Sequence, residues 1–384
     1  MLKQQLELLL VLPTAKDGKF FAKQNSTQYV RKVVTVNRRV VKSIANKLRV
    51  QVRNPRKIRT TSYIPFAKQL YELLIAPLEP ELTENQIDTL IFSMNKGLRA
   101  FPIAALNNGE QFLIEKYAVG LIPSFSLTDT RYRPLENPRL LAFGVMAGAP
   151  VRDMAAPRCA NGKYPETDSL TCCGCGIAHI KGYLGRNLSI KQRLWLTLNC
   201  KTVPIAQRGA AISYSIIHVA THAEFKPGKI ENSYIQFWNE KLQLDRLRQL
   251  SEKSQWSADP KVELLVLSAC KTALGNEQAE LGFAGLALQA GVKTAIGSLW
   301  YVSDRGSLAL MSEFYHQLKT APLKTEALRQ TQLAMLKEQV LIKDGQLQLP
   351  DRVIPIPEEI ASTGLTTLSH PYFWSAFTVI GNWN

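Results

Sequence analysis

The chain has 384 residues, of which 46% are hydrophobic, and it carries a formal net charge of +16 at pH 7. This length suits two domains or one large α/β domain, and the composition is that of a packed globular protein. No apolar run approaches the roughly 20 residues of a membrane-spanning helix, so we expect no membrane insertion. Glu7 interrupts the apolar opening, and no small-residue cleavage site follows it. A first strand is therefore favoured over a signal peptide, and we expect a cytoplasmic protein.

Positive charge is concentrated near the amino terminus. Between Lys16 and Arg59 the sole acidic residue is Asp17, whereas lysines and arginines recur throughout. Such a field attracts acidic partners, nucleic acid or anionic lipid. No interleaved aromatic residues and no nucleic-acid module accompany the charge. We therefore favour a solvated surface, or a face that docks on acidic subunits, over nucleic-acid binding.

The first 135 residues contain no Cys and no His. We expect one strand and then a basic helix up to about residue 60. The aliphatic stripe of that helix would consist of Val30, Val33, Val34, Val40, Val41, Ile44 and Leu48. The following predicted elements are a helix over 63–75 that Pro77 and Pro80 end, a strand over 89–93, and two strands over 112–115 and 117–122.

Two short apolar runs in the second part each stop at a reactive side chain. Residues 214–222 end at His222, and residues 263–270 end at Cys270. Such runs are typical of buried parallel strands whose carboxyl ends open into a site. If the strands are neighbours, imidazole and thiol lie close together. His218 shares the face of His222 by the period of two, deeper in the sheet, and we expect it to be a core residue.

Other patterns complete the second part. The predicted elements are a strand over 140–146, a hairpin of 234–238 and 241–244, a helix over 280–289, a strand over 293–300, helices over 304–318 and 324–339, and a strand over 373–379. The glycine-rich exit of the 140–146 strand lacks a phosphate-binding motif, so we expect no nucleotide cofactor.

Residues 152–211 have no clear periodicity and hold five of the six cysteines. One interpretation is a zinc site, because Cys172 and Cys175 are spaced as C-x-x-C; its further ligands would be drawn from Cys159, Cys173, Cys200 and His179. A second is a disulfide framework, which a cytosolic setting disfavours. A third is that the segment is a disordered loop or foreign to the fold, as if read out of register. We favour the third and expect no metal.

The strands that end at His222 and Cys270 resemble the CHAT domain, a family of caspase-like cysteine peptidases related to separase and metacaspases. The resemblance continues through 70–77, 98–102, 118–124, 282–287, 290–304 and 370–383. It implies an α/β fold with a mostly parallel, caspase-like sheet flanked by helices. It also implies a catalytically silent support half over 1–135 and an active half over 136–384, of which residues 152–211 are atypical.

The resemblance assigns roles to individual residues. Cys270 would be the nucleophile and His222 the general acid for the leaving amine. The oxyanion donors would be the backbone N–H groups of Cys270 and Ala223. The family usually has Gly after the histidine, so Ala223 is a departure that could misaim the oxyanion pocket.

A substrate pocket with a carboxylate would favour a basic residue before the cut. Its candidates are Asp304, Glu280 and Glu277. Asp304 has an alternative role at the start of a helix. His316 and His370 stand in segments that packing explains better.

The function implied by the resemblance is that of a cysteine endopeptidase acting on protein substrates, with no cofactor. The alternative is a catalytically impaired CHAT module that acts in regulation through protein contacts. Family members are commonly joined to tetratricopeptide repeats, which suggests partners of that type, although the period of about 34 residues is not found here. A basic nucleic-acid binder is a third, less favoured class.

Overall fold

A computed structural model provides the structure of the chain. It describes residues 4–13, 29–95, 98–99, 101–124, 128, 130–132, 135, 138, 140–144, 215–220, 223–224, 234–236, 241–243, 262–268, 282–289, 291–301, 303–356 and 364–384. None of the described helices is long and apolar enough to cross a membrane. The cysteine-rich segment 152–211 lies outside the described residues, so the three interpretations of it stay predictions.

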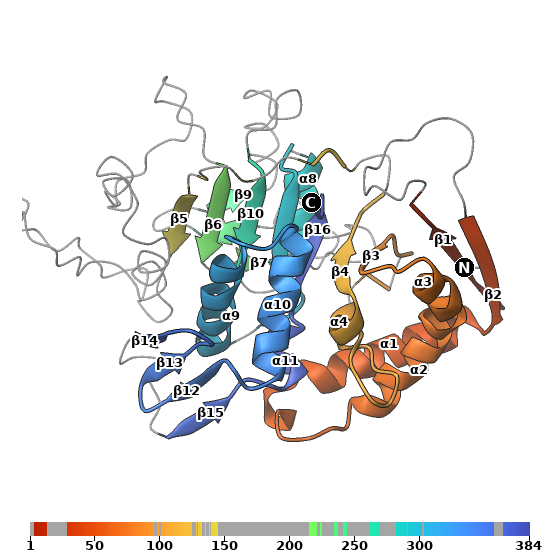
Figure 1. The fold of residues 1–384 in the computed structure, drawn as a ribbon, viewed down its shortest axis with the longest axis horizontal. Helices are drawn as coiled ribbons and strands as arrows, with labels where there is room; N and C mark the ends of the chain where they lie inside the picture. Colours follow the sequence, from red (N-terminus) through yellow and green to blue (C-terminus); the bar gives the residue numbers. More distant parts are fainter. Residues whose placement is uncertain are drawn as a thin grey trace, which may run out of the picture.

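A seven-stranded sheet forms the centre of the fold (Figure 1). Its strands, in spatial order, are β3 (Thr89–Phe92), β4 (Ala118–Leu121), β16 (Phe377–Gly381), β11 (Thr294–Ser298), β10 (Leu264–Leu267), β6 (Ile216–Ala220) and β5 (Leu140–Gly144). Neighbouring strands are parallel except for β11 and β16, which are antiparallel. The mostly parallel sheet predicted from the sequence is therefore confirmed.

Helices cover both faces of this sheet. Figure 1 shows α9 (Asp304–Gln317) and α10 (Lys324–Leu336) side by side in front of it. Ile217 and Leu265 pack with Ala287 of α8 (Gly282–Gln289) on one face. The next residue along β6, His218, contacts Tyr315 of α9 on the other face. Covered on both sides, every residue of β11 is buried.

The amino-terminal part adds a ribbon and a helical layer. Its elements are β1 (Gln5–Val11), β2 (Tyr29–Thr35), α1 (Arg38–Val52), η1 (Pro55–Lys57), α2 (Ile64–Leu74), η2 (Ala76–Leu78) and α3 (Glu79–Glu84). Strands β1 and β2 pair only with each other among the described strands. β3 and β4 also come from this part and join β16 in the main sheet. Whether residue 135 divides two folding units stays a prediction.

The predicted helical stripe was wrong in its first half. Val30, Val33 and Val34 lie in β2, because a run of valines with tyrosine and threonine favours an extended chain. The helix begins only at Arg38. Asn37 caps it by accepting a hydrogen bond from the Arg39 N–H at 2.8 Å.

One predicted strand was wrong and another was predicted to start too early, and a short helix forms at each of the two places. Residues 112–115 were expected to be extended, but α4 (Leu113–Lys116) forms there; the Glu115 carboxylate accepts from the Phe112 N–H at 2.6 Å. The last strand was expected over 373–379, but α11 (Pro371–Trp374) precedes β16. His370 caps α11 through Nδ1, which accepts from the Tyr372 N–H at 3.0 Å.

Most other predicted elements are confirmed where the structure describes them. They include α2, β3, β4, β5, α8, β11, α9, α10 and the hairpin of β8 (Tyr234–Gln236) and β9 (Lys241–Gln243). A four-stranded antiparallel sheet was not predicted; it comprises β12 (Leu341–Lys343), β13 (Gln346–Gln348), β14 (Val353–Pro355) and β15 (Leu365–Thr367).

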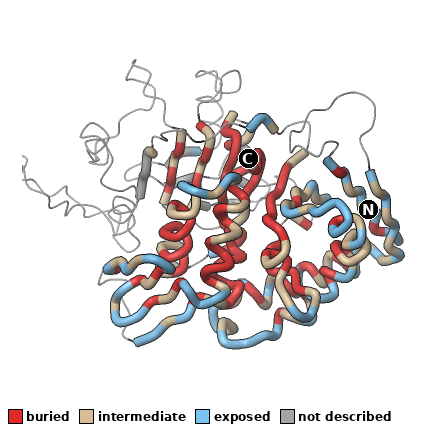
Figure 2. Tube along the Cα trace, in the orientation of Figure 1, coloured by how far each residue is buried: buried red, intermediate tan, exposed pale blue. Residues whose placement is uncertain are grey.

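The core follows the main sheet and its helices, whereas exposed residues concentrate on the ribbon, α1 and the β12–β15 sheet (Figure 2). One continuous cluster of buried apolar side chains reaches from Leu48 and Leu70 in the helical layer to Trp374 and Phe377. The elements of both parts are therefore packed on a shared core.

A buried ionic group lies where β10 and β11 begin. Lys293 Nζ is 2.6 Å from Glu263 Oε1, and the Lys293 side chain is 1% exposed. Lys324, the first residue of α10, is also buried and donates to the backbone carbonyl of Asn384. Burial lowers the pKa of Lys324 to about 8; Glu263 opposes this shift and Lys293 adds to it.

Candidate functional site

The strands that precede the two predicted reactive residues are neighbours in the sheet. β6 and β10 are parallel, with Ile216 paired to Leu264 and Val219 to Leu267. The ladder continues to Ser268, whose N–H donates to the Val219 carbonyl at 3.1 Å. Both strands therefore run toward one edge of the sheet, as their sequence pattern predicts. His222 and Cys270 follow that edge in the chain but lie outside the described residues.

Three polar side chains are joined beneath this edge. His218 Nε2 lies 2.8 Å from Ser268 Oγ, and Tyr315 Oη lies 2.9 Å from His218 Nδ1. We call His218, Ser268 and Tyr315 the His218 cluster. It connects β6, the residue that follows β10, and α9, so three elements meet in one chain of hydrogen bonds.

The His218 cluster is uncharged at neutral pH. His218 is 2% exposed, and burial lowers its pKa to about 4. Burial also raises the pKa of Tyr315, so its hydroxyl stays protonated. A neutral imidazole donates from one ring nitrogen and accepts at the other, and the two hydroxyl groups can serve either need. His218 is therefore the core residue that the sequence predicts.

Ala223, the predicted oxyanion donor next to His222, begins the short strand β7 (Ala223–Glu224). β7 pairs antiparallel with β8, with Ala223 opposite Ile235. With β9 it forms a three-stranded sheet separate from the main one. The chain therefore enters a new sheet within three residues of the end of β6.

The predicted pocket residues are only partly described. Asp304 is exposed and occupies the first turn of α9, where a carboxylate favours the helix dipole. The N-cap itself is Ser303, whose hydroxyl accepts from the Gly306 N–H at 3.2 Å. Asp304 thus supports the start of the helix without capping it. Glu280 and Glu277 lie outside the described residues.

Aromatic side chains lie where β11 ends. Trp300 is buried, and its indole N–H donates to the Tyr372 carbonyl at 3.1 Å. The Tyr372 hydroxyl donates in return to the Tyr301 carbonyl at 3.2 Å. The Tyr301 side chain is 51% exposed. Because β10 and β11 are parallel, this rigid turn borders the same edge as the ends of β6 and β10.

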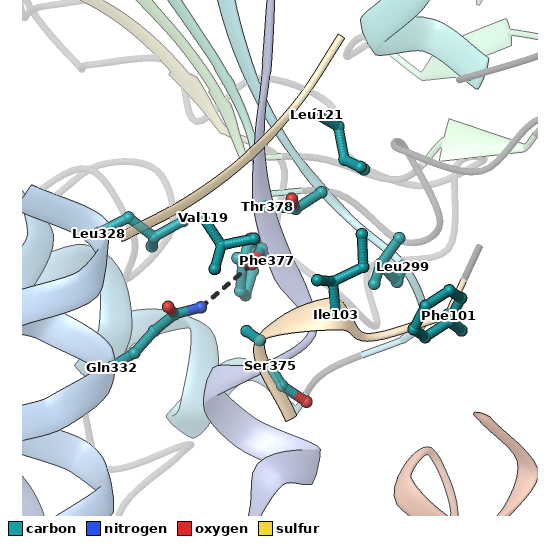
Figure 3. Close-up of a pocket in the computed structure, with 11 residues that line it drawn as sticks. Phe101, Ile103, Val119, Leu121, Leu299, Leu328, Gln332, Ser375, Phe377 and Thr378 are labelled. Carbon is teal, nitrogen blue, oxygen red and sulfur yellow. Dashed lines mark hydrogen bonds between the residues drawn. The ribbon is translucent and has the colours of Figure 1, made fainter. Parts of the chain in front are cut away.

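A small cavity lies farther along the sheet, between β4, β16 and α10 (Figure 3). Its lining is largely apolar and includes Val119, Leu328 and Phe377. Gln332 points toward it, and its amide donates to the Phe377 carbonyl at 3.3 Å. The volume of about 10 Å³ holds roughly one water molecule. The cavity is a packing gap and too small for a peptide side chain.

Within the part of the chain that the structure describes, no three His, Cys, Asp or Glu side chains gather as metal ligands. Besides His218, the structure describes two histidines, and local contacts place both of them. His316 Nε2 lies 3.3 Å from Asp351 on the surface, and the buried His370 ring packs edge-on against Tyr63. Burial lowers the pKa of His370 to about 4, while a backbone hydrogen bond with Thr60 opposes the shift.

Sequence reasoning missed the two partners of His218. Ser268 stands two residues before Cys270, so the alternation that places His218 below His222 also places Ser268 below Cys270. Tyr315 carries no such signal, because only the docking of α9 brings it to the sheet.

The comparisons with known proteins agree with this architecture. A family model described as the CHAT domain matches residues 65–382, which is most of the chain. Comparison with curated proteins finds no match. The matched range contains all seven strands of the main sheet, together with the segments that hold His222 and Cys270. The chain belongs to the CHAT domain family, a family of caspase-like cysteine peptidases.

Proposed function

We propose that the protein is a cysteine endopeptidase that cleaves protein substrates through a dyad of His222 and Cys270. The register of two strands carries the proposal. β6 and β10 pair residues that are 48 positions apart, and His222 and Cys270 are separated by the same 48 positions. Continued for two residues beyond Ala220 and Ser268, this ladder would place imidazole and thiol opposite each other on one face.

Such a pair has the chemistry that peptide cleavage needs. A free thiol has a pKa near ~8.5, and a neighbouring imidazolium stabilises the thiolate. The Cys270 thiolate would attack the substrate carbonyl carbon, and His222 would pass its proton to the leaving amine. Water would then hydrolyse the thioester and regenerate the thiol. The N–H groups of Ala223 and Cys270 are our proposed donors to the oxyanion.

The second candidate is a CHAT module that keeps the fold and has lost turnover. Two features favour it. Ala stands at position 223, where the family usually has Gly, and residues 152–211 lack the periodicity of the rest of the chain. In that case the protein would act by binding partners, and tetratricopeptide-repeat proteins are our proposed class. A carboxylate pocket of Asp304 or Glu280 and a cytoplasmic location also stay predictions.

A peptidyl acyloxymethyl ketone, which alkylates an activated thiol at its methylene carbon with loss of the carboxylate, separates the two candidates. We expect intact mass to show one added probe on the wild type and none on Cys270→Ala. His222→Ala should label at least about 100-fold more slowly, because general acid–base help is lost. Cys200→Ala is the matched control and should label like the wild type. A folded wild type that resists the probe would favour the binding module.

The register itself can be tested without any activity. In His222→Cys, mild oxidation should link the introduced thiol to Cys270, since paired strand positions lie within disulfide reach. Thr221→Cys is the control, because alternation sends that side chain to the opposite face. Peptide mass spectrometry identifies the linked pair. Equal linkage in both variants, or none in His222→Cys, would contradict the continued ladder.

A further inference from the structure

We infer that His218 is a positioning residue of the proposed peptidase site: its ring joins the end of β10 to α9 and thereby sets the geometry from which the segments carrying His222 and Cys270 depart. The inference rests on the proposed function. It concerns a residue outside the dyad and the oxyanion donors.

The geometry of His218 uses both of its ring nitrogens. Nε2 lies 2.8 Å from Ser268 Oγ and Nδ1 lies 2.9 Å from Tyr315 Oη. The ring is 2% exposed and Tyr315 is 3% exposed, so the hydrogen bond between them is shielded from water, whereas Ser268 is half-buried. The ring orientation is therefore fixed from two sides, by a strand residue and by a helix residue.

Ser268 is held to β6 through two different groups. Its N–H donates to the Val219 carbonyl, and its hydroxyl bonds to the His218 ring. In the ladder His218 is opposite Val266, so its ring reaches diagonally to Ser268, two residues farther along the chain and just beyond the end of β10. Ser268 is also the last described residue before Cys270. The contact thus acts two residues before Cys270 in the chain.

Tyr315 provides the third support. It lies near the end of α9, and its ring centroid is 5.7 Å from that of His218 and 5.5 Å from that of Phe314. α9 packs on α10, which in turn contacts β4 and β16. Through Tyr315, the His218 ring is therefore tied to the packed layer of α9 and α10. We expect this link to limit movement at the carboxyl ends of β6 and β10. Displacements of about 1 Å at a reacting group can cost about 100-fold in rate.

A purely structural role makes a different prediction from a positioning role. If the cluster only stabilises the core, loss of one hydroxyl lowers the unfolding midpoint and leaves the chemistry of Cys270 unchanged. If the cluster positions the site, the same change also weakens the coupling between thiol and imidazole, which the pH dependence of Cys270 alkylation reports.

The experiment measures the alkylation rate of Cys270 by iodoacetamide from pH 5 to pH 10, read at the peptide level by mass spectrometry. It compares the wild type with Tyr315→Phe and Ser268→Ala, and Ser268→Thr restores the hydroxyl. We expect a wild-type thiol pKa below ~8.5 that moves toward ~8.5 in the first two variants and recovers in Ser268→Thr. The inactivation rate with the peptidyl ketone should fall about 10- to 100-fold at unchanged probe affinity.

Matched controls lose a buried hydroxyl elsewhere. The Tyr71 hydroxyl donates to Glu79 at 2.5 Å, and the Ser375 hydroxyl donates to the Pro371 carbonyl at 2.7 Å. Tyr71→Phe and Ser375→Ala should lower the unfolding midpoint but leave the pH profile of Cys270 at its wild-type position.

The outcomes separate the inference from the function on which it rests. A wild-type Cys270 that titrates like a free thiol would overturn the peptidase proposal. A depressed wild-type pKa that Tyr315→Phe and Ser268→Ala leave unchanged would overturn the positioning role of His218 and leave the peptidase proposal standing. Each of these variants removes one oxygen atom only, so both are suited to measurement as folded proteins.

Discussion

At the scale of single residues, buried polar side chains lie at both ends of the central strands of the main sheet. His218 joins elements near the carboxyl ends of β6 and β10, and Lys324 lies with Glu263 and Lys293 at the opposite edge. The two groups differ in charge. The His218 cluster is neutral, whereas Lys324 carries a proton that burial disfavours.

Lys324 therefore makes stability depend on alkaline pH. Its pKa is about 8 in the folded protein and 10.5 in the reference state, so the unfolded chain binds more protons between these values. Stability should rise as pH increases through that window, by up to about 3 kcal/mol. Urea unfolding at pH 7.5 and pH 10 should show this gain for the wild type relative to Lys324→Met. Parallel behaviour of the two proteins would contradict it.

Position 381 requires glycine for two reasons, its backbone conformation and the atoms packed against it. Its φ is +97°, and a Cβ there would lie 2.5 Å from the Lys293 carbonyl oxygen and 2.6 Å from Leu288 Cδ2. Gly381→Ala should lower the free energy of unfolding by at least about 1–3 kcal/mol, as measured by urea unfolding. Gly364→Ala is the control, because φ is +80° but a Cβ meets nothing within 4 Å. Equal losses in the two variants would show that close packing adds nothing at Gly381.

The part of the candidate site that lies on β6 and β10 could be predicted from the sequence, because side chains alternate between the two faces of a strand. The two apolar runs gave adjacent parallel strands with ends at one edge, and His218 is the core residue that the period of two indicates. Tyr315 could not be found, because its place depends on how α9 packs. The family resemblance, rather than the pattern, supplied the roles of His222 and Cys270.

At the scale of elements, one arginine ties the carboxyl half of the chain to the amino-terminal part. Arg329 of α10 donates to the Ile114 carbonyl at 2.7 Å and to the Glu115 carbonyl at 2.9 Å. Both carbonyls belong to α4, whose single turn cannot satisfy them internally. Glu326 lies 3.1 Å from the same guanidinium and orients it.

Loss of this clamp should loosen the contact between α10 and α4. We expect Arg329→Ala to reduce the free energy of unfolding by about 1–3 kcal/mol, since two hydrogen bonds to a charged group are lost. Arg329→Lys should recover only part of the loss, because an ammonium lacks the planar fork that reaches both carbonyls. Amide hydrogen exchange should rise at Tyr117, whose N–H donates to the Leu113 carbonyl in α4. Unchanged exchange there would exclude the clamp.

The elements that were wrongly predicted share a cause. Residues 112–115 and 371–374 are apolar and aromatic, which favours strands, but Glu115 and His370 cap a single helical turn in each. A helix cap depends on one residue, so it does not show in the spacing of apolar residues from which helices and strands are predicted. The β12–β13 hairpin did carry a signal: Asp344 and Gly345 both have positive φ, at 48° and 74°, as a two-residue Asp-Gly turn requires.

At the scale of the whole molecule, α1 stands out as a long helix that carries basic residues and no acidic one. α1 buries Val41, Ala45, Leu48 and Val52, and cations dominate the remainder of its surface. No acidic residue occurs between Lys19 and Tyr71. This face should dominate the attraction of the protein for polyanions, whose strength falls as salt rises.

Charge reversal tests how much of the binding to polyanions comes from the basic face of α1. Arg39→Glu, Lys47→Glu and Arg53→Glu, combined, should lower the salt concentration at which the protein leaves a sulfated resin. A matched triple reversal of Lys319, Lys337 and Lys343 changes the net charge equally on the other part of the surface. We expect a much smaller shift from the control. Equal shifts would mean that the whole surface contributes evenly.

The central position of β16 in the main sheet has a consequence for the order in which the sheet can form. β16 lies between β4 and β11 but follows every other strand of the sheet in the sequence. Until β16 emerges from the ribosome, β4 and β11 each lack their shared neighbour, and both edges are open to wrong pairing. The two halves of the sheet can join only after residues 377–381 emerge, so the main sheet is completed by the last of its strands to be synthesised.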